Sequence, residues 1–223
     1  MAIVNTIASS SLTPESRMIL SRLGKLEWIS DFYLAGSAAL AIYLRHRSVR
    51  DLDFMSQVSR LRAIERRDLL QDLIEWDPAT RVETARDGFL YVRVDNQVAL
   101  RFFYYPYPLI ESENRLEDGA VASPEDLGLM KLGAIISRGT RRDFVDLYLL
   151  CQQIPLSELL ARSQDKFGHV NDFALQAIKG LADLSLTQGE PMPELSQPVD
   201  WRLVQEWLEN EVRSLARDRI GRG

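Results

Sequence analysis

The chain of 223 residues carries a formal net charge of −5 and one cysteine, and its 46% hydrophobic and 26% charged residues exclude a disordered or disulfide-built protein. This mild negative charge argues against broad, non-specific binding of nucleic acid. No run of about 18 apolar residues and no basic-then-apolar leader pattern occurs, so we expect no membrane partner and a cytoplasmic location.

The first half of the chain predicts a small mixed β-sheet flanked by helices. Apolar residues at helical spacing, with capping signals, predict helices over residues 13–24, 37–44 and 59–76. Alternating apolar and β-branched runs predict strands over residues 31–35, 50–55, 81–85, 89–95 and 98–104. The pair Asp95-Asn96 predicts a hairpin between the last two strands.

The second half reads as helical. A polar connection over residues 109–121, with one edge strand, precedes expected helices over residues 124–138, 141–153, 156–167, 171–185 and 200–219. We therefore predict an α+β fold, with an α/β domain over residues 1–120 and a C-terminal helical domain over residues 121–223.

Two carboxylates follow the first predicted strand-and-helix unit. Asp51 and Asp53 stand two residues apart on the second strand, where side chains at i and i+2 share a face and lie roughly 7 Å apart. A hard cation such as Mg²⁺, or Mn²⁺ in its place, is commonly held by one or two carboxylates together with substrate phosphates. The pair therefore predicts a metal site that includes a phosphate ligand.

The turn before the second helix could supply the phosphate contacts. Gly36 allows a tight approach of the backbone, and Ser37 with the first helical N–H groups offers donors to phosphate oxygens. Together with the carboxylates, these residues predict binding of a metal–nucleoside triphosphate. The alternative is that Asp51 and Asp53 only cap a strand end or pair with Arg47 and Arg50.

Basic residues gather on both sides of the carboxylates. Arg45, His46, Arg47 and Arg50 precede them, and we expect this group, Arg47 included, to contact phosphate or RNA. The group that follows reads as a solvated helix face and consists of Arg60, Arg62, Arg66 and Arg67. His46 lacks a neighbouring His or Cys and is not expected to bind a metal.

These motifs resemble the nucleotidyltransferase superfamily, most closely its AbiEii/AbiGii/MenT toxin-like branch. The resemblance lies in Gly36-Ser37, in the tract that ends at Asp51-Leu52-Asp53, in the strand near Arg101 and in the helical run over residues 124–147. It implies that Lys131 contacts the triphosphate and that Asp146, or less favourably Asp143, is a later functional acid. Arg138 falls two helical turns beyond Lys131 on the same face, where it could also contact phosphate. A salt bridge at the start of a helix is the alternative role for Asp143.

One position departs from the superfamily pattern. Many members carry a third carboxylate on the strand after the hairpin, and Arg101 stands at that position here, whereas Asp95 falls in the turn. Two carboxylates could suffice with help from Asp146, or the domain could be a weak catalyst.

The resemblance implies a metal-dependent nucleotidyltransferase. It would transfer NMP from a nucleoside triphosphate to a hydroxyl of RNA, such as the 3′ end of a tRNA, or of a protein. Its setting would be a toxin–antitoxin pair or phage defence, with a cognate antitoxin. One alternative is a noncatalytic module that binds nucleotide or a protein partner. A metal-dependent glycosyltransferase, which also uses Asp-x-Asp, ranks last because little chain precedes the motif.

Overall fold

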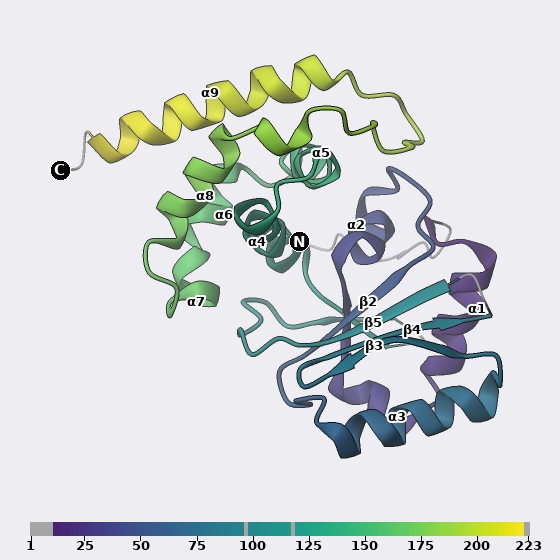
Figure 1. Cartoon of the computed structure of the whole chain (residues 1–223). Coiled ribbons are helices and arrows are strands. Elements are labelled where there is room, and N and C mark those ends of the chain that lie inside the picture. Colours follow the sequence, from purple (N-terminus) through teal and green to yellow (C-terminus); the bar gives the residue numbers. More distant parts are fainter. Residues whose placement is uncertain (1–10, 96–97, 117–118, 221–223) are drawn as a thin grey trace. The chain divides into compact units, whose positions relative to one another are not determined.

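The computed structural model describes residues 11–95, 98–116 and 119–220 and divides the chain into two compact units, Met1–Ser123 and Pro124–Gly223 (Figure 1). The first unit holds the sheet, and the second is helical. Among the described helices, none has the length and apolar character that a membrane crossing requires.

The first unit is built on a seven-stranded mixed sheet in the order β3-β4-β5-β2-β1-β7-β6. The strands are β1 (Tyr33–Ala35), β2 (Leu52–Ser56), β3 (Arg81–Arg86), β4 (Phe89–Val94), β5 (Val98–Tyr104), β6 (Asn114–Leu116) and β7 (Gly119–Val121). β2 lies between β1, to which it is antiparallel, and β5, to which it is parallel. The predicted α+β fold with a mixed sheet flanked by helices is confirmed.

Among the described residues of the first unit, four helical segments accompany the sheet: α1 (Pro14–Leu23), the 3₁₀ segment η2 (Glu27–Asp31), α2 (Gly36–Leu44) and α3 (Ala63–Trp76). α1 begins as predicted, because Thr13 Oγ1 accepts the Ser16 N–H at 3.3 Å and Pro14 occupies the first turn. α2 is an internal helix, with Ala38, Ala39, Leu40, Ala41 and Ile42 all buried.

The two faces of the sheet differ sharply in burial. Leu90, Val92 and Val94 of β4 are fully buried, and Phe54 stacks on Phe102 with ring centroids 5.2 Å apart. Trp28 of η2 covers this face, since its ring meets Phe102 at 5.7 Å. Its Nε1 donates to Asp72 Oδ2 of α3 at 2.8 Å, and α3 runs along the sheet in Figure 1. The opposite face carries the intervening residues, including Asp53 and Arg101.

Several boundaries in the first unit differ from the predicted ones. Residues Glu27–Asp31 form η2, so the first strand begins only at Tyr33. The second strand begins at Leu52, which places Asp51 just before it. The connection over residues 109–121 holds two short strands rather than one, because β6 and β7 pair with each other and β7 also pairs with β1. Asp95 adopts φ 50° in the β4–β5 hairpin, whereas Asn96 lies outside the described residues.

In the described part of the second unit, the regular elements are all helical. They are α4 (Pro124–Ser137), α5 (Arg141–Leu150), α6 (Leu156–Ala161), α7 (Ser163–Phe167), α8 (Phe173–Ala182), the 3₁₀ segment η3 (Ser185–Thr187) and α9 (Trp201–Ile220). The single helix predicted over residues 156–167 is wrong, since it breaks at Arg162. The hydroxyl of Ser163 donates to the Leu160 carbonyl oxygen at 2.7 Å, and such a local bond competes with the regular helical pattern.

Candidate nucleotide and metal site

The turn between β1 and α2 lies directly beside Asp53. Ala35, the last residue of β1, is paired with Asp53 across the antiparallel β1–β2 ladder, and α2 begins at the next residue, Gly36. Gly36 has φ +61°, and a Cβ atom built there would stand 2.6 Å from Asp53 Oδ2. Glycine is therefore required both by the backbone conformation and by the close approach of the carboxylate.

Arg101 joins the two carboxylates. It is paired with Asp53 across the parallel β2–β5 ladder, its Nη1 donates to Asp53 Oδ1 at 3.0 Å, and its Nη2 donates to Asp51 Oδ2 at 2.9 Å. Asp51 and Asp53 thus lie on the same face of the sheet, with Arg101 as their described ion-pair partner.

The Arg101 guanidinium is held on an aromatic ring. Its Cζ lies 5.1 Å from the centroid of Tyr91, the residue opposite Arg101 on β4. Partial burial would lower the pKa of Arg101, but the charges and hydrogen bonds of Asp53 and Asp51 outweigh it and raise that pKa. The side chain is therefore a fixed cation beside both carboxylates.

The carboxylates retain oxygen atoms that suit a hard cation. Arg101 takes one oxygen of each, which leaves Asp53 Oδ2 facing Gly36, while Asp51 Oδ1 accepts the Ala99 N–H at a long 3.4 Å. The side chains of Asp51 and Asp53 are 41% and 26% exposed, so water and phosphate can reach them. Two partly exposed carboxylate oxygens fit the partial protein coordination that is usual for Mg²⁺.

Arg47, a predicted phosphate contact, is buried and hydrogen-bonded to its neighbour in the chain. Arg47 is 8% exposed, and its Nε donates to His46 Nε2 at 3.2 Å.

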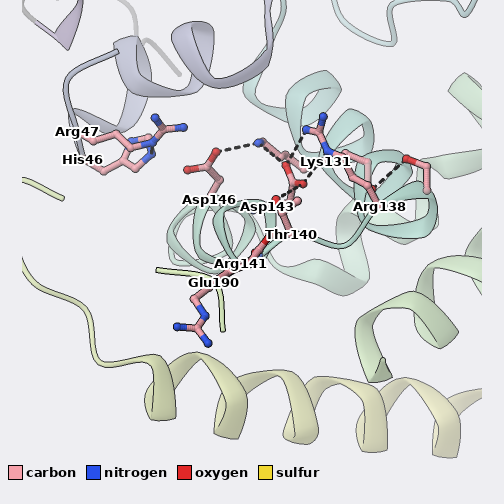
Figure 2. A network of polar contacts seen from close by, with 11 residues as sticks. His46, Arg47, Lys131, Arg138, Thr140, Arg141, Asp143, Asp146 and Glu190 are labelled. Carbon is pink, nitrogen blue, oxygen red and sulfur yellow. Dashed lines mark hydrogen bonds and ion pairs between the residues drawn. The ribbon is translucent and has the colours of Figure 1, made fainter. Parts of the chain in front are cut away.

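In the second unit, Lys131 of α4 lies between two acids of α5: its Nζ is 3.0 Å from Asp143 Oδ1 and 2.8 Å from Asp146 Oδ2 (Figure 2). The Lys131 side chain is only 6% exposed, so the two ion pairs are buried.

Asp143 is the centre of this second cluster. Arg138 donates to it through Nε and Nη2 at 3.0 and 3.1 Å, and the Thr140 hydroxyl donates at 2.7 Å (Figure 2). Thr140 also caps α5, because its Oγ1 accepts the Asp143 N–H. The predicted role of Asp143 in salt bridges is confirmed, since it contacts both Lys131 of α4 and Arg138, the residue that follows α4.

Most of the sequence matches a known protein family. A profile of the family described as "Nucleotidyl transferase AbiEii toxin, Type IV TA system" matches residues 18–214. The chain belongs to this AbiEii nucleotidyltransferase family. The branch-level resemblance predicted from Gly36, Ser37, Asp51 and Asp53 is therefore confirmed.

The chain is also similar to individual proteins. An uncharacterized protein of Aquifex aeolicus (strain VF5), aq_aa25, is 28% identical over 206 residues, which cover 91% of this chain and 96% of that protein. The crystal structure of a candidate nucleotidyltransferase from H. pylori has a TM-score of 0.52 at 17% identity and covers 91% of this chain and 92% of that one. The Megavirus polyadenylate synthase is similar to 67% of this chain at a TM-score of 0.48 and 17% identity, and the match spans 34% of the viral protein.

Within the AbiEii family assignment, the roles of the individual residues stay predictions. The structure brings together Gly36, Asp51 and Asp53 in the first unit, and Lys131, Asp143 and Asp146 in the second. The double ion pair of Arg101 and its Tyr91 support were not predicted. A partial signal was present, since the alternation around Arg101 places it on the face opposite the apolar Phe102.

The charge cluster at Asp143 predicts a loss of stability in acid. Burial opposes ionisation of Asp143, but Lys131, Arg138 and Thr140 outweigh it and lower its pKa from an ordinary 3.8 to about 2. A lowered pKa stabilises the folded state above about pH 4, and this contribution disappears as the pH falls through about 2. We expect the free energy of unfolding, measured in urea, to fall by about 2 kcal/mol over this window because of Asp143 alone.

The Asp143→Asn variant isolates this contribution. Its carboxamide cannot titrate, so its stability should fall less steeply than that of the wild type between about pH 4 and pH 2. Equal acid slopes for the variant and the wild type would show that Asp143 does not carry the effect.

Proposed function

We propose that the chain transfers a nucleoside monophosphate from a nucleoside triphosphate to a hydroxyl group of a macromolecular acceptor. The observation that carries this proposal is the close approach of the Gly36 turn to Asp53. A Cβ atom built on Gly36 would stand 2.6 Å from Asp53 Oδ2, and a second carboxylate, that of Asp51, lies beside them. Membership of the AbiEii nucleotidyltransferase family supports the same reaction class.

The residues of the first unit would divide the work between phosphate and metal. The first N–H groups of α2 begin at the Gly36 turn and would donate to phosphate oxygens near Gly36 and Ser37. Asp51 and Asp53 would hold Mg²⁺ or Mn²⁺. When bound, the ion supplies positive charge to the triphosphate and to the leaving group. We further propose, from the resemblance, that Lys131 contacts the triphosphate and that Asp146 is a later functional acid. Arg47 and Arg138 would add contacts to phosphate.

The reaction is an in-line displacement at the α-phosphorus. The acceptor hydroxyl forms a new bond to the α-phosphate and loses its proton to water, while the bond to the β-phosphate breaks and pyrophosphate leaves. The side chains need form no covalent bond, so the rate depends on positioning and charge. The acceptor would be RNA, such as a tRNA 3′ end, or a protein, and a cognate antitoxin would restrain the activity.

A broad transfer assay tests the proposal. The purified chain is incubated with each α-labelled nucleoside triphosphate in turn, Mg²⁺ or Mn²⁺, and total RNA or total protein, and the products are separated on denaturing gels. We expect metal-dependent label on one macromolecular acceptor. Absence of label with every nucleotide, both ions and both acceptor pools would contradict the proposal.

Arg101 supports one alternative, a noncatalytic module that binds nucleotide or a protein partner. Both carboxylates are already bound to the guanidinium, at 2.9 and 3.0 Å, and this cation stands where a third acid is usual. The two functions differ in nucleotide binding. Titration calorimetry that detects no Mg²⁺-dependent binding of any triphosphate would favour the protein-binding form of this module.

The Arg101 ion pairs predict that this residue weakens metal binding. In Arg101→Gln the two carboxylates lose a competing cation, so the affinity for Mn²⁺ without nucleotide should rise by about tenfold, as a pair of hydrogen-bonded charges is worth about 1–3 kcal/mol. Electron paramagnetic resonance of free Mn²⁺ measures this directly.

Arg93→Gln is the matched control for Arg101→Gln. Arg93 also lies on Tyr91, at 5.4 Å, and also forms an ion pair, but its acid is Glu83. This control should leave Mn²⁺ binding unchanged. Unchanged binding in Arg101→Gln as well would mean that Asp51 and Asp53 are not the metal ligands.

A further inference from the structure

The face of the sheet that carries Arg101 continues beyond the carboxylates over β4 and β3. Directly opposed residues of neighbouring strands point to the same face, and the register places Tyr91 opposite Arg101, Phe89 opposite Phe103, and Arg86 opposite Phe89. We call this surface the Arg–aromatic face. Its members are Arg86, Phe89, Tyr91, Arg93, Arg101 and Phe103.

Cations and rings are in contact throughout this face. The Arg86 guanidinium lies 5.4 Å from the Phe89 ring, and the Phe89 and Phe103 ring centroids are 4.8 Å apart. Beside them, Tyr91 receives Arg101 at 5.1 Å and Arg93 at 5.4 Å. The side chains form one continuous layer that ends at Asp53, the residue paired with Arg101 on β2.

This layer is open to solvent, unlike the opposite face of the same strands. Phe89, Tyr91 and Phe103 are half-buried and Arg86 is exposed, whereas their neighbours Leu90 and Phe102 are fully buried. Cross-strand pairs of this kind stabilise a sheet by about 0.2–1 kcal/mol each, and this stabilisation explains why single pairs of side chains are in contact. Sheet stability does not explain why three aromatic rings stay partly exposed to water beside a candidate active site.

The chemistry of the layer matches single-stranded nucleic acid. Exposed rings offer stacking surfaces for unpaired bases, arginine side chains offer contacts to phosphate and to base faces, and open sheet faces with such rings are a known way to bind unpaired strands. A protein acceptor would need no stacking surface. The net charge of −5 does not oppose this, because the arginines are concentrated locally.

We propose that the Arg–aromatic face binds an unpaired nucleic-acid strand and leads its end to Asp51 and Asp53. The inference rests on the proposed function, and it selects nucleic acid over protein as the acceptor. Bases stack on Phe89 and Phe103, Arg86 contacts the backbone, and the strand end reaches the carboxylates over Tyr91.

Fluorescence anisotropy with a labelled RNA of about 12 unpaired nucleotides tests the face without nucleotide or metal. The wild type should bind it more tightly than a duplex of the same sequence. The double variant Phe89→Leu and Phe103→Leu keeps apolar side chains on the strands but removes the rings, and it should weaken binding by about tenfold or more. A labelled DNA of the same sequence shows whether the ribose hydroxyls contribute, and binding of either strand supports the face.

Arg86→Gln gives a second test that carries little risk of unfolding, because Arg86 is exposed. It should weaken binding and reduce the dependence of affinity on salt, as expected when one phosphate contact is lost. The matched controls are Arg67→Gln, whose side chain is 69% exposed on α3, and Val82→Thr, 48% exposed on β3. Both should bind like the wild type.

No binding by the wild type, or equal binding by the wild type, the ring variant and Arg86→Gln, would overturn the proposal and leave a protein acceptor in its place. Because the assay contains no triphosphate, its result is independent of whether transfer occurs. Binding without transfer in the labelled-nucleotide assay would refute the proposed function alone.

Discussion

Replacing Asp53 by asparagine should reduce nucleotidyl transfer by about a thousandfold. The substitution keeps the size of the side chain but removes the negative charge that faces Gly36 through Oδ2. Loss of charge stabilisation of several kcal/mol corresponds to a rate loss of this order. The rate of label transfer from an α-labelled triphosphate, under conditions where the wild type is active, measures the effect.

The fold of Asp53→Asn should survive, because Arg101 retains its contact with Asp51 at 2.9 Å. Asp68→Asn is the matched control, since it removes the same charge from a side chain that is 60% exposed and pairs with Arg67. It should transfer label at the wild-type rate. If Asp53→Asn keeps more than about a tenth of that rate, the carboxylate is not part of the reaction.

The second large effect is expected at Lys131, and it is a loss of folding stability rather than a direct loss of catalytic rate. Lys131→Met removes an ammonium group that contacts two buried carboxylates, those of Asp143 and Asp146. Breaking a buried charge network by removing one member costs about 3–5 kcal/mol. The free energy of unfolding in urea, followed by circular dichroism at neutral pH, should fall by this amount.

Lys179→Met provides the comparison for Lys131→Met. Lys179 is exposed on α8, so its loss should change stability by less than about 0.5 kcal/mol. If Lys131→Met is as stable as this control, Lys131 is not a structural centre and its role would be contact with phosphate. Any loss of transfer in Lys131→Met must therefore be measured at a temperature where the variant remains folded.

The sequence predicts the local elements near the site well. Gly36 stands between an apolar strand and the apolar helix α2. The sequence patterns of the strand and of the helix are both clear, and the tight turn between them needs a glycine, so a strand–turn–helix unit is the expected structure. Alternation also identifies Leu52 and Phe54 as core residues, which the structure confirms. Ends of elements are less certain, since a local hydrogen bond such as that of Ser163 can divide a helix without changing its apolar pattern.

Long-range pairing is the part that the sequence did not reveal. Arg101 is 48 residues from Asp53 in the chain, and only the parallel register of β2 and β5 brings its guanidinium onto both carboxylates. The burial of Lys131 was equally hidden. A lysine on an amphipathic helix is usually exposed, whereas the side chain of Lys131 is buried and contacts two acids of the next helix.

The position of the transferred phosphorus tests the central claim most directly. In parallel reactions with the acceptor found in the broad assay, one triphosphate is labelled at the α-phosphorus and the other at the γ-phosphorus. We predict that α-label appears on the acceptor while γ-label leaves as pyrophosphate, in the presence of Mg²⁺ or Mn²⁺. Label from the γ-position on the acceptor would show phosphoryl transfer and would contradict the account.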